Sequence, residues 1–199
     1  MRLQGMTLLA IDLGKSGGIA YTDTDGSVHA VAMPDTVADV ERLLRTLVCV
    51  DTTCFIEEIP MYRGKMNLRS TAVLFRNFGQ IEGVLASLKC RVEYLKPDWW
   101  QKALRLGKSA DHGDRWKAHL KGRAQALFPR VDVTLKTADA LLILEAGRMH
   151  TVASKSTNFT NCAGDGETSR GKSVIEERGV LGYSERSDHC GFDLIGPEA

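Results

Sequence analysis

The chain has 199 residues, of which 43% are hydrophobic and 26% charged, with a formal net charge of +1. This length suits one globular domain with an appendage. No stretch is apolar enough to span a bilayer, and the N-terminus MRLQGM lacks the apolar segment of a signal peptide. Five scattered cysteines without CxxC pairing argue against a disulfide framework. We therefore expect no membrane partner and no secretion, with the protein in the cytoplasm of a bacterial or phage-infected cell, or otherwise intracellular.

The first predicted element is an apolar strand at residues 8–13 that contains one carboxylate, Asp12. It is followed by a turn at 14–18, a second strand at 19–22, a hairpin turn at Asp25-Gly26 and a third strand at 27–33. The three strands are predicted to form an antiparallel meander. Because an ionised Asp among apolar side chains is unfavourable without a cationic partner, a divalent metal is the leading candidate for that partner.

Helical and strand patterns then alternate along the chain. The expected elements are a helix from Val37 to near Cys49, a strand at 54–59, a helix from a Ser70 cap to Leu88, a strand at 91–95, a short helix from Pro97, a helix at about 115–127 and a last helix capped by Thr137 and ending near Met149. Residues 61–69 and 108–113 are predicted loops, the first of them basic. Because the composition becomes polar and aperiodic after 150, we expect a domain at 1–150 and a flexible tail at 151–199.

Three acidic positions lie on otherwise apolar elements: Asp12, then Glu57 or Glu58, then Asp139. Asp139 shares a helical stripe with apolar residues four and seven positions further on, so its side chain is expected to face the sheet. Three converging carboxylates suit Mg²⁺ or Mn²⁺ better than zinc. Two such ions can activate a water and stabilise the leaving oxygen of a phosphodiester.

The motifs AIDLGKSGGIA, FIEE, LKPDWWQKAL, LFP and TADALLILEAGRM follow one another in an order and spacing that resembles the RuvC-like Holliday-junction resolvases. These belong to the ribonuclease H superfamily and include phage and organellar relatives. The resemblance covers about three quarters of the chain, from Thr7 to Met149. It implies an α/β, ribonuclease H-like fold, with a five-stranded mixed sheet (three antiparallel strands, then α-β-α-β) flanked by helices. It also implies a homodimeric, metal-dependent endonuclease that holds a four-way DNA junction and nicks two strands symmetrically.

Carried over residue by residue, the resemblance makes Asp12, Glu57 and Asp139 the ligands of two Mg²⁺ or Mn²⁺ ions. Lys117, between the third and fourth motifs, resembles the basic residue near the scissile phosphate, and Lys108 is a second candidate for that work. Many relatives carry a further acid or histidine shortly before the last Asp. Here the position three residues earlier is Lys136, with Asp132 as a possible substitute, so the fourth ligand is left open.

The predicted DNA contacts follow Glu57. Arg63, Lys65 and Arg69 are expected to bind phosphates together with Lys108, while Met61 or Tyr62 wedges against an unstacked base near the crossover. Two other functions stay open: a junction-binding protein that does not cleave, and a ribonuclease H-fold nuclease acting on structured RNA. Sugar kinases begin with a similar strand, but they need about twice this length.

Overall fold

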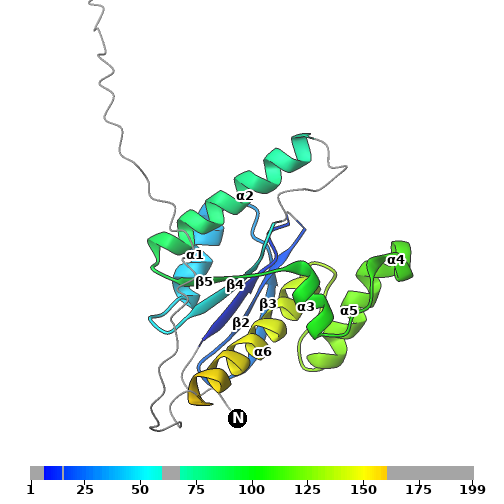
Figure 1. The fold of residues 1–199 in the computed structure, drawn as a ribbon. Helices are drawn as coiled ribbons and strands as arrows, with labels where there is room; N and C mark the ends of the chain where they lie inside the picture. The colour runs from blue at the N-terminus through cyan, green and yellow to red at the C-terminus, as the bar shows by residue number, and fades with distance from the viewer. Residues whose placement is uncertain (1–6, 15, 60–67, 161–199) are drawn as a thin grey trace, which may run out of the picture. The chain divides into compact units, whose positions relative to one another are not determined.

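The computed structural model describes residues 7–14, 16–59 and 68–160, with side chains as far as 153. A mixed five-stranded sheet lies at its centre (Figure 1). Its strands are β1 (Leu8–Ile11), β2 (Gly18–Thr22), β3 (Val28–Ala32), β4 (Thr53–Glu57) and β5 (Arg91–Leu95), in the order β3-β2-β1-β4-β5. Strand β2 runs antiparallel to β1 and β3, and β4 runs parallel to β1 and β5. The predicted α/β architecture with a five-stranded mixed sheet is confirmed.

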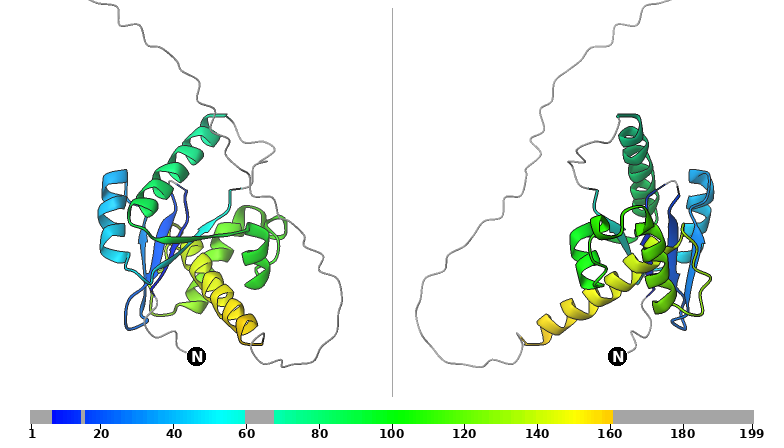
Figure 2. Two further views of the ribbon diagram at one scale, coloured as in Figure 1. Left: turned by 60° about the vertical axis from the view of Figure 1, so that its left-hand side comes forward. Right: turned by 90° about the vertical axis from the view of Figure 1, so that its right-hand side faces the viewer.

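Helices cover both faces of the sheet (Figures 1 and 2). They are α1 (Val37–Leu47), α2 (Leu68–Ser87), α3 (Pro97–Ala103), α4 (Ser109–His112), α5 (Trp116–Leu127) and α6 (Ala138–Thr160), with a 3-10 turn at Gly113–Arg115. One core lies between the sheet and α1 and α2, and the other lies between the sheet and α3, α5 and α6. Within the described residues, no helix is long and apolar enough to cross a membrane.

Side chains alternate between the two cores along each central strand. Leu8 and Ala10 of β1 belong to the core under α6, whereas Leu9 and Ile11 belong to the core under α1 and α2. On β4, Phe55 faces α6 in the same way. Because successive residues of a strand point to opposite faces, Asp12 and Glu57 continue the rows that face α6. Glu58 falls on the other row, so strand geometry selects Glu57 of the two adjacent glutamates.

A glycine sets the close approach of α6 to the sheet. A Cβ atom on Gly147 would lie 2.3 Å from the ring of Phe55, a distance that no real side chain tolerates. Without that atom, α6 can lie directly on β4. The first turn of the helix, with Asp139, is thereby placed above the ends of β1 and β4.

Several predicted boundaries differ from those of the structure. Helix α2 begins at Leu68, so Arg69 and Ser70 lie in its first turn and Ser70 is not its cap; Leu and Arg are both strong helix formers. Residues 109–112 form the short helix α4 in place of a loop, because the Asp111 carboxylate accepts the Lys108 N–H (3.3 Å) and the His112 ring stacks on His119 of α5.

Helix α6 continues past Met149 to Thr160, so the predicted boundary at 150 falls inside a helix. The polar composition of 151–160 suggested a tail, yet this stretch contains neither Gly nor Pro to end the helix. Residues 161–199 of the predicted tail lie outside the described residues.

Candidate metal and nucleic-acid site

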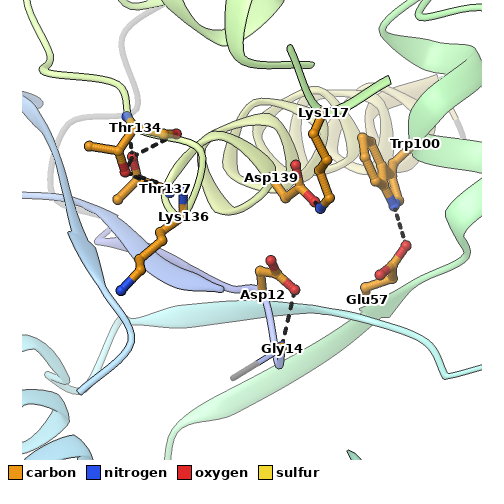
Figure 3. A network of polar contacts seen from close by, with 9 residues as sticks. All are labelled: Asp12, Gly14, Glu57, Trp100, Lys117, Thr134, Lys136, Thr137 and Asp139. Carbon is orange, nitrogen blue, oxygen red and sulfur yellow. Dashed lines mark hydrogen bonds and ion pairs between the residues drawn. The ribbon is translucent and has the colours of Figure 1, made fainter. Parts of the chain in front are cut away.

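Four predicted residues meet at one edge of the sheet. Asp12 directly follows β1 and Glu57 ends β4, and the parallel register pairs Ile11 with Ile56, the residues just before them. Asp139 lies in the first turn of α6, and Lys117 lies in the first turn of α5. Figure 3 shows the four side chains facing a common space above the strand ends. Elements far apart in the sequence therefore supply three carboxylates and one ammonium group to this edge.

Asp12 is the most constrained of these residues. Burial raises the pKa of its carboxyl, and the nearby Asp139 charge raises that pKa further. The backbone N–H of Gly14 donates to Oδ1 (3.2 Å) and acts in the opposite direction, as does the Lys117 charge. A Cβ atom on Gly17 would lie 2.9 Å from Oδ2, so only glycine leaves room for the Asp12 side chain.

Lys117 pairs with Asp139 through a hydrogen bond from Nζ to Oδ2. Burial acts to lower the pKa of Lys117, but this bond and the charges of the three carboxylates together raise it. The ammonium therefore stays protonated and supplies the positive charge that the acidic cluster requires. The Lys117 side chain is 60% exposed, against 15% for Asp139, so it can swing outward while the carboxylate cannot.

The other oxygen of Asp139, Oδ1, is buried and has no hydrogen-bond partner among the described residues. A buried carboxylate oxygen without a partner is unfavourable, and a cation would satisfy it. The negative charge of the nearby Asp12 carboxylate also favours a cation at this position. The Asp12 and Asp139 carboxylates therefore fit a hard divalent ion such as Mg²⁺ or Mn²⁺.

Glu57 is held differently from the two aspartates. The indole N–H of Trp100 donates to Oε1 at 3.2 Å. In the described ranges, no three His, Cys, Asp or Glu side chains stand close enough together to hold one metal ion. The arrangement is therefore an aspartate pair with a neighbouring glutamate, and not a closed set of three ligands.

The other predicted residues lie away from this cluster or outside the description. Asp132 and Lys136 are exposed, and Figure 3 shows the Lys136 side chain extending away from Asp139. Arg69 is exposed on the first turn of α2. Lys108, also exposed, lines a pocket of about 620 Å³. Met61, Tyr62, Arg63 and Lys65 lie outside the described residues.

Trp100 is the site residue that sequence reasoning missed. Its side chain is buried in the core, and its indole N–H donates to the candidate ligand Glu57. The sequence did contain a signal for this contact. A buried indole N–H requires an acceptor, and few acidic residues lie on apolar elements that could supply one.

The five-stranded sheet with helices on both faces is similar to the fold of two solved RuvC structures. A search against protein-family models finds no match, and neither does a search of curated proteins. Among solved structures, RuvC of Thermus thermophilus in complex with a Holliday junction substrate is similar with a TM-score of 0.52 and 14% identity, covering 74% of this chain and 96% of that one. A second Thermus thermophilus RuvC structure gives a TM-score of 0.50 and 17% identity, covering 75% and 97% respectively.

Proposed function

We propose that this protein is a metal-dependent endonuclease that resolves four-way DNA junctions by symmetric nicking. The observation that carries the proposal is the convergence of Asp12, Asp139 and Lys117, beside Glu57, on the fold of RuvC. One of the similar RuvC structures contains a Holliday junction substrate. Branched DNA is therefore the first substrate to test.

In this mechanism Asp12, Glu57 and Asp139 would hold divalent ions, which when bound would supply activation of a water and stabilisation of the leaving oxygen of the phosphodiester. Trp100 fixes the orientation of Glu57 through its N–H. The exposed Nζ of Lys117 leaves Asp139 and donates to a phosphate oxygen, where its positive charge stabilises the charge that develops on the phosphoryl group.

A cleavage assay on a labelled four-way junction tests the proposal directly. The wild-type protein with Mg²⁺ is expected to nick two opposing strands, and Asp12→Asn is expected to bind the junction without cutting it. Retained cleavage by Asp12→Asn would overturn the assignment of this residue. Structured RNA as a parallel substrate distinguishes a ribonuclease of the same fold.

A second candidate function is junction binding without cleavage. One observation favours it: the part of the chain described by the structure contains no set of three ligands close enough for one ion. Tight binding of the junction by the wild-type protein, with no strand cut in either Mg²⁺ or Mn²⁺, would establish this function in place of the first.

Metal binding can be measured independently of activity. Tb³⁺ binds oxygen ligands as other hard cations do, and its luminescence is sensitised by a nearby indole. Trp100 lies against Glu57, whereas Trp99 packs on His150. We expect the Tb³⁺ signal to fall in Trp100→Phe and to persist in the matched control Trp99→Phe. An equal signal from both variants would place the ion elsewhere.

The pocket next to Lys108 supplies a candidate contact for the DNA backbone. Its lining includes three cationic side chains, Lys102, Arg105 and Lys108, and one carboxylate, Asp98. Because each phosphate contact releases counterions, Lys108→Ala is expected to lower the slope of log affinity against log salt by about 1. The same measurement on Arg63→Ala, Lys65→Ala and Arg69→Ala tests the predicted basic segment, and Met61→Ala and Tyr62→Ala test the wedge.

The homodimer remains part of the proposal, and helix α2 supplies the face that supports it. Gly79 and Gly83 lie on its exposed side with no atom of the described chain near their Cβ positions, and Phe75 beside them is 42% exposed. Alanine at both positions has room within the monomer. Its methyl groups would, however, prevent the α2 helices of two subunits from packing closely. We therefore expect the double variant to weaken dimerisation in sedimentation experiments, and an unchanged dimer would exclude this face.

A further inference from the structure

Three cysteines gather at the end of the sheet opposite the candidate site. Cys49 lies in the loop before β4, Cys54 is in β4, and Cys90 directly precedes β5. The parallel register pairs Cys54 with Val92, which brings the starts of the two strands together. Glu57 lies at the far end of β4, so chemistry at these thiols is separate from the carboxylate cluster.

Cys49 and Cys90 both contact Thr52. The Cys49 sulfur lies 3.2 Å from the Thr52 hydroxyl, and the Cys90 sulfur lies 3.8 Å from the Thr52 carbonyl oxygen. The Thr52 N–H also donates to the Cys49 carbonyl (3.0 Å), which closes a tight turn around this residue. Both sulfurs therefore contact the same residue, Thr52, and a disulfide would require the exposed Cys49 side chain to turn toward Cys90.

The three thiols differ in exposure and in the direction of their pKa shifts. Cys49 is exposed, and its hydrogen bonds with the Thr52 and Thr7 hydroxyls lower the pKa of its thiol. Burial raises the pKa of the half-buried Cys90, and that of the fully buried Cys54 lies well above its ordinary value. Since the thiolate is the reactive form, Cys49 is the nucleophile of the group and Cys54 is inert.

We propose that Cys49 is a hydroperoxide-reactive thiol and that Cys90 resolves its oxidised form as an intramolecular Cys49–Cys90 disulfide. An accessible thiol of lowered pKa beside a second thiol is the arrangement found in redox-sensing cysteines. This site is independent of the proposed nuclease function, because none of its residues belongs to the carboxylate cluster.

The two steps balance as follows. The Cys49 thiolate attacks a peroxide oxygen, an S–O bond forms, the O–O bond breaks, and the leaving hydroxide or alkoxide takes a proton to give water or an alcohol. The sulfur is oxidised by two electrons to a sulfenic acid, and the peroxide is reduced by the same two. The Cys90 thiolate then attacks the Cys49 sulfur, an S–S bond forms, the S–O bond breaks, and the released hydroxide combines with the Cys90 proton as water.

Proteolysis can place the three cysteines in different peptides, so that the oxidation state of each is measured separately. Cleavage before Asp51 together with cleavage after Lys and Arg places Cys49, Cys54 and Cys90 in three different peptides, 46–50, 51–63 and 90–91. The full-length protein is treated with stoichiometric hydrogen peroxide, with and without dimedone to trap sulfenic acid, and is then digested without reduction. A variant in which Cys162 and Cys190 are both serine removes the two cysteines that lie outside the described residues.

The expected product is a linked pair of peptides 46–50 and 90–91, with a mass loss of about 2 Da relative to the two free thiols. In Cys90→Ser the link is lost and the dimedone adduct accumulates on Cys49. In the matched control Cys54→Ser the link still forms. A disulfide that includes Cys54, a link only between two chains, or a Cys49 adduct that never converts to the link would each overturn the proposal.

Discussion

The turn after β1 offers a sharp test of how the candidate site is built, through the variant Gly17→Ala. The added Cβ would lie 2.3 Å from the Asp12 carbonyl oxygen and 2.8 Å from its Cγ, so the aspartate has to move. Overpacking of this kind destabilises a fold by about 1–3 kcal/mol. A displacement of about 1 Å at a reacting centre lowers a rate roughly 100-fold. We therefore expect both a lower free energy of unfolding and a loss of junction cleavage of at least that size.

The matched control lies in the same turn. A Cβ on Gly14 would meet its nearest atom, Asp12 Oδ1, at 3.6 Å, which is ordinary contact. Gly14→Ala also keeps the N–H that donates to Asp12. Denaturant unfolding, Tb³⁺ titration and junction cleavage are measured on both variants. If Gly17→Ala matches Gly14→Ala in all three, the glycine does not hold Asp12 in place and this account of the turn is wrong.

Three other predictions concern packing, titration and charge. Gly147→Ala is expected to lower the free energy of unfolding by about 1–3 kcal/mol, because its Cβ would enter the Phe55 ring. Burial and the Glu82 carboxylate raise the pKa of Tyr94 to about 12. The stability that Tyr94 contributes is thus complete below pH ~10, its ordinary pKa, and is lost as the pH rises toward 12. In a chelator, Asp12→Asn is expected to raise the unfolding temperature by removing a buried like charge, whereas Mg²⁺ should stabilise only the wild-type protein.

Each of these has its own control. Gly122 of α5 has open space at its Cβ position, so Gly122→Ala should stabilise the protein by up to about 1 kcal/mol, and a loss there as large as at Gly147 would remove the packing argument. Ultraviolet titration of the wild type against Tyr94→Phe isolates the Tyr94 phenol, and a difference curve with its midpoint at pH ~10 would show that its pKa is not raised. A lower unfolding temperature for Asp12→Asn in chelator would mean that the carboxylate is stabilising.

The periodic signals in the sequence were sufficient for most of the fold. Continuous apolar runs predict β1 and β4, which are buried on both faces, and an apolar stripe predicts α6. Burial is what both patterns record. The same reasoning correctly oriented Asp139 toward the sheet. It failed where a local polar contact decided the outcome, as at α4, which depends on Asp111 and on the stacking of His112.

The candidate site was predictable only in part for a related reason. Position in a strand or helix predicts which way a carboxylate points, so the convergence of Asp12 and Asp139 could be expected. The partners of these groups could not, because the pair formed by Lys117 and Asp139 and the bond between Trp100 and Glu57 join residues with no fixed spacing in the sequence. Only the packing of α3 and α5 against the sheet brings them together.

The distribution of charge at the strand ends favours a cation-dependent reaction over simple DNA binding. Asp12 and Asp139 are like charges held close together at the ends of buried elements, and Lys117 satisfies only one oxygen of the pair by a direct bond. A surface that only bound phosphates would be weakened by negative charge at this point, since phosphates are themselves anionic. Asparagine would fill the same space without that repulsion. In the proposed reaction the two carboxylates would act through a bound cation, which would offset their charge toward the phosphate.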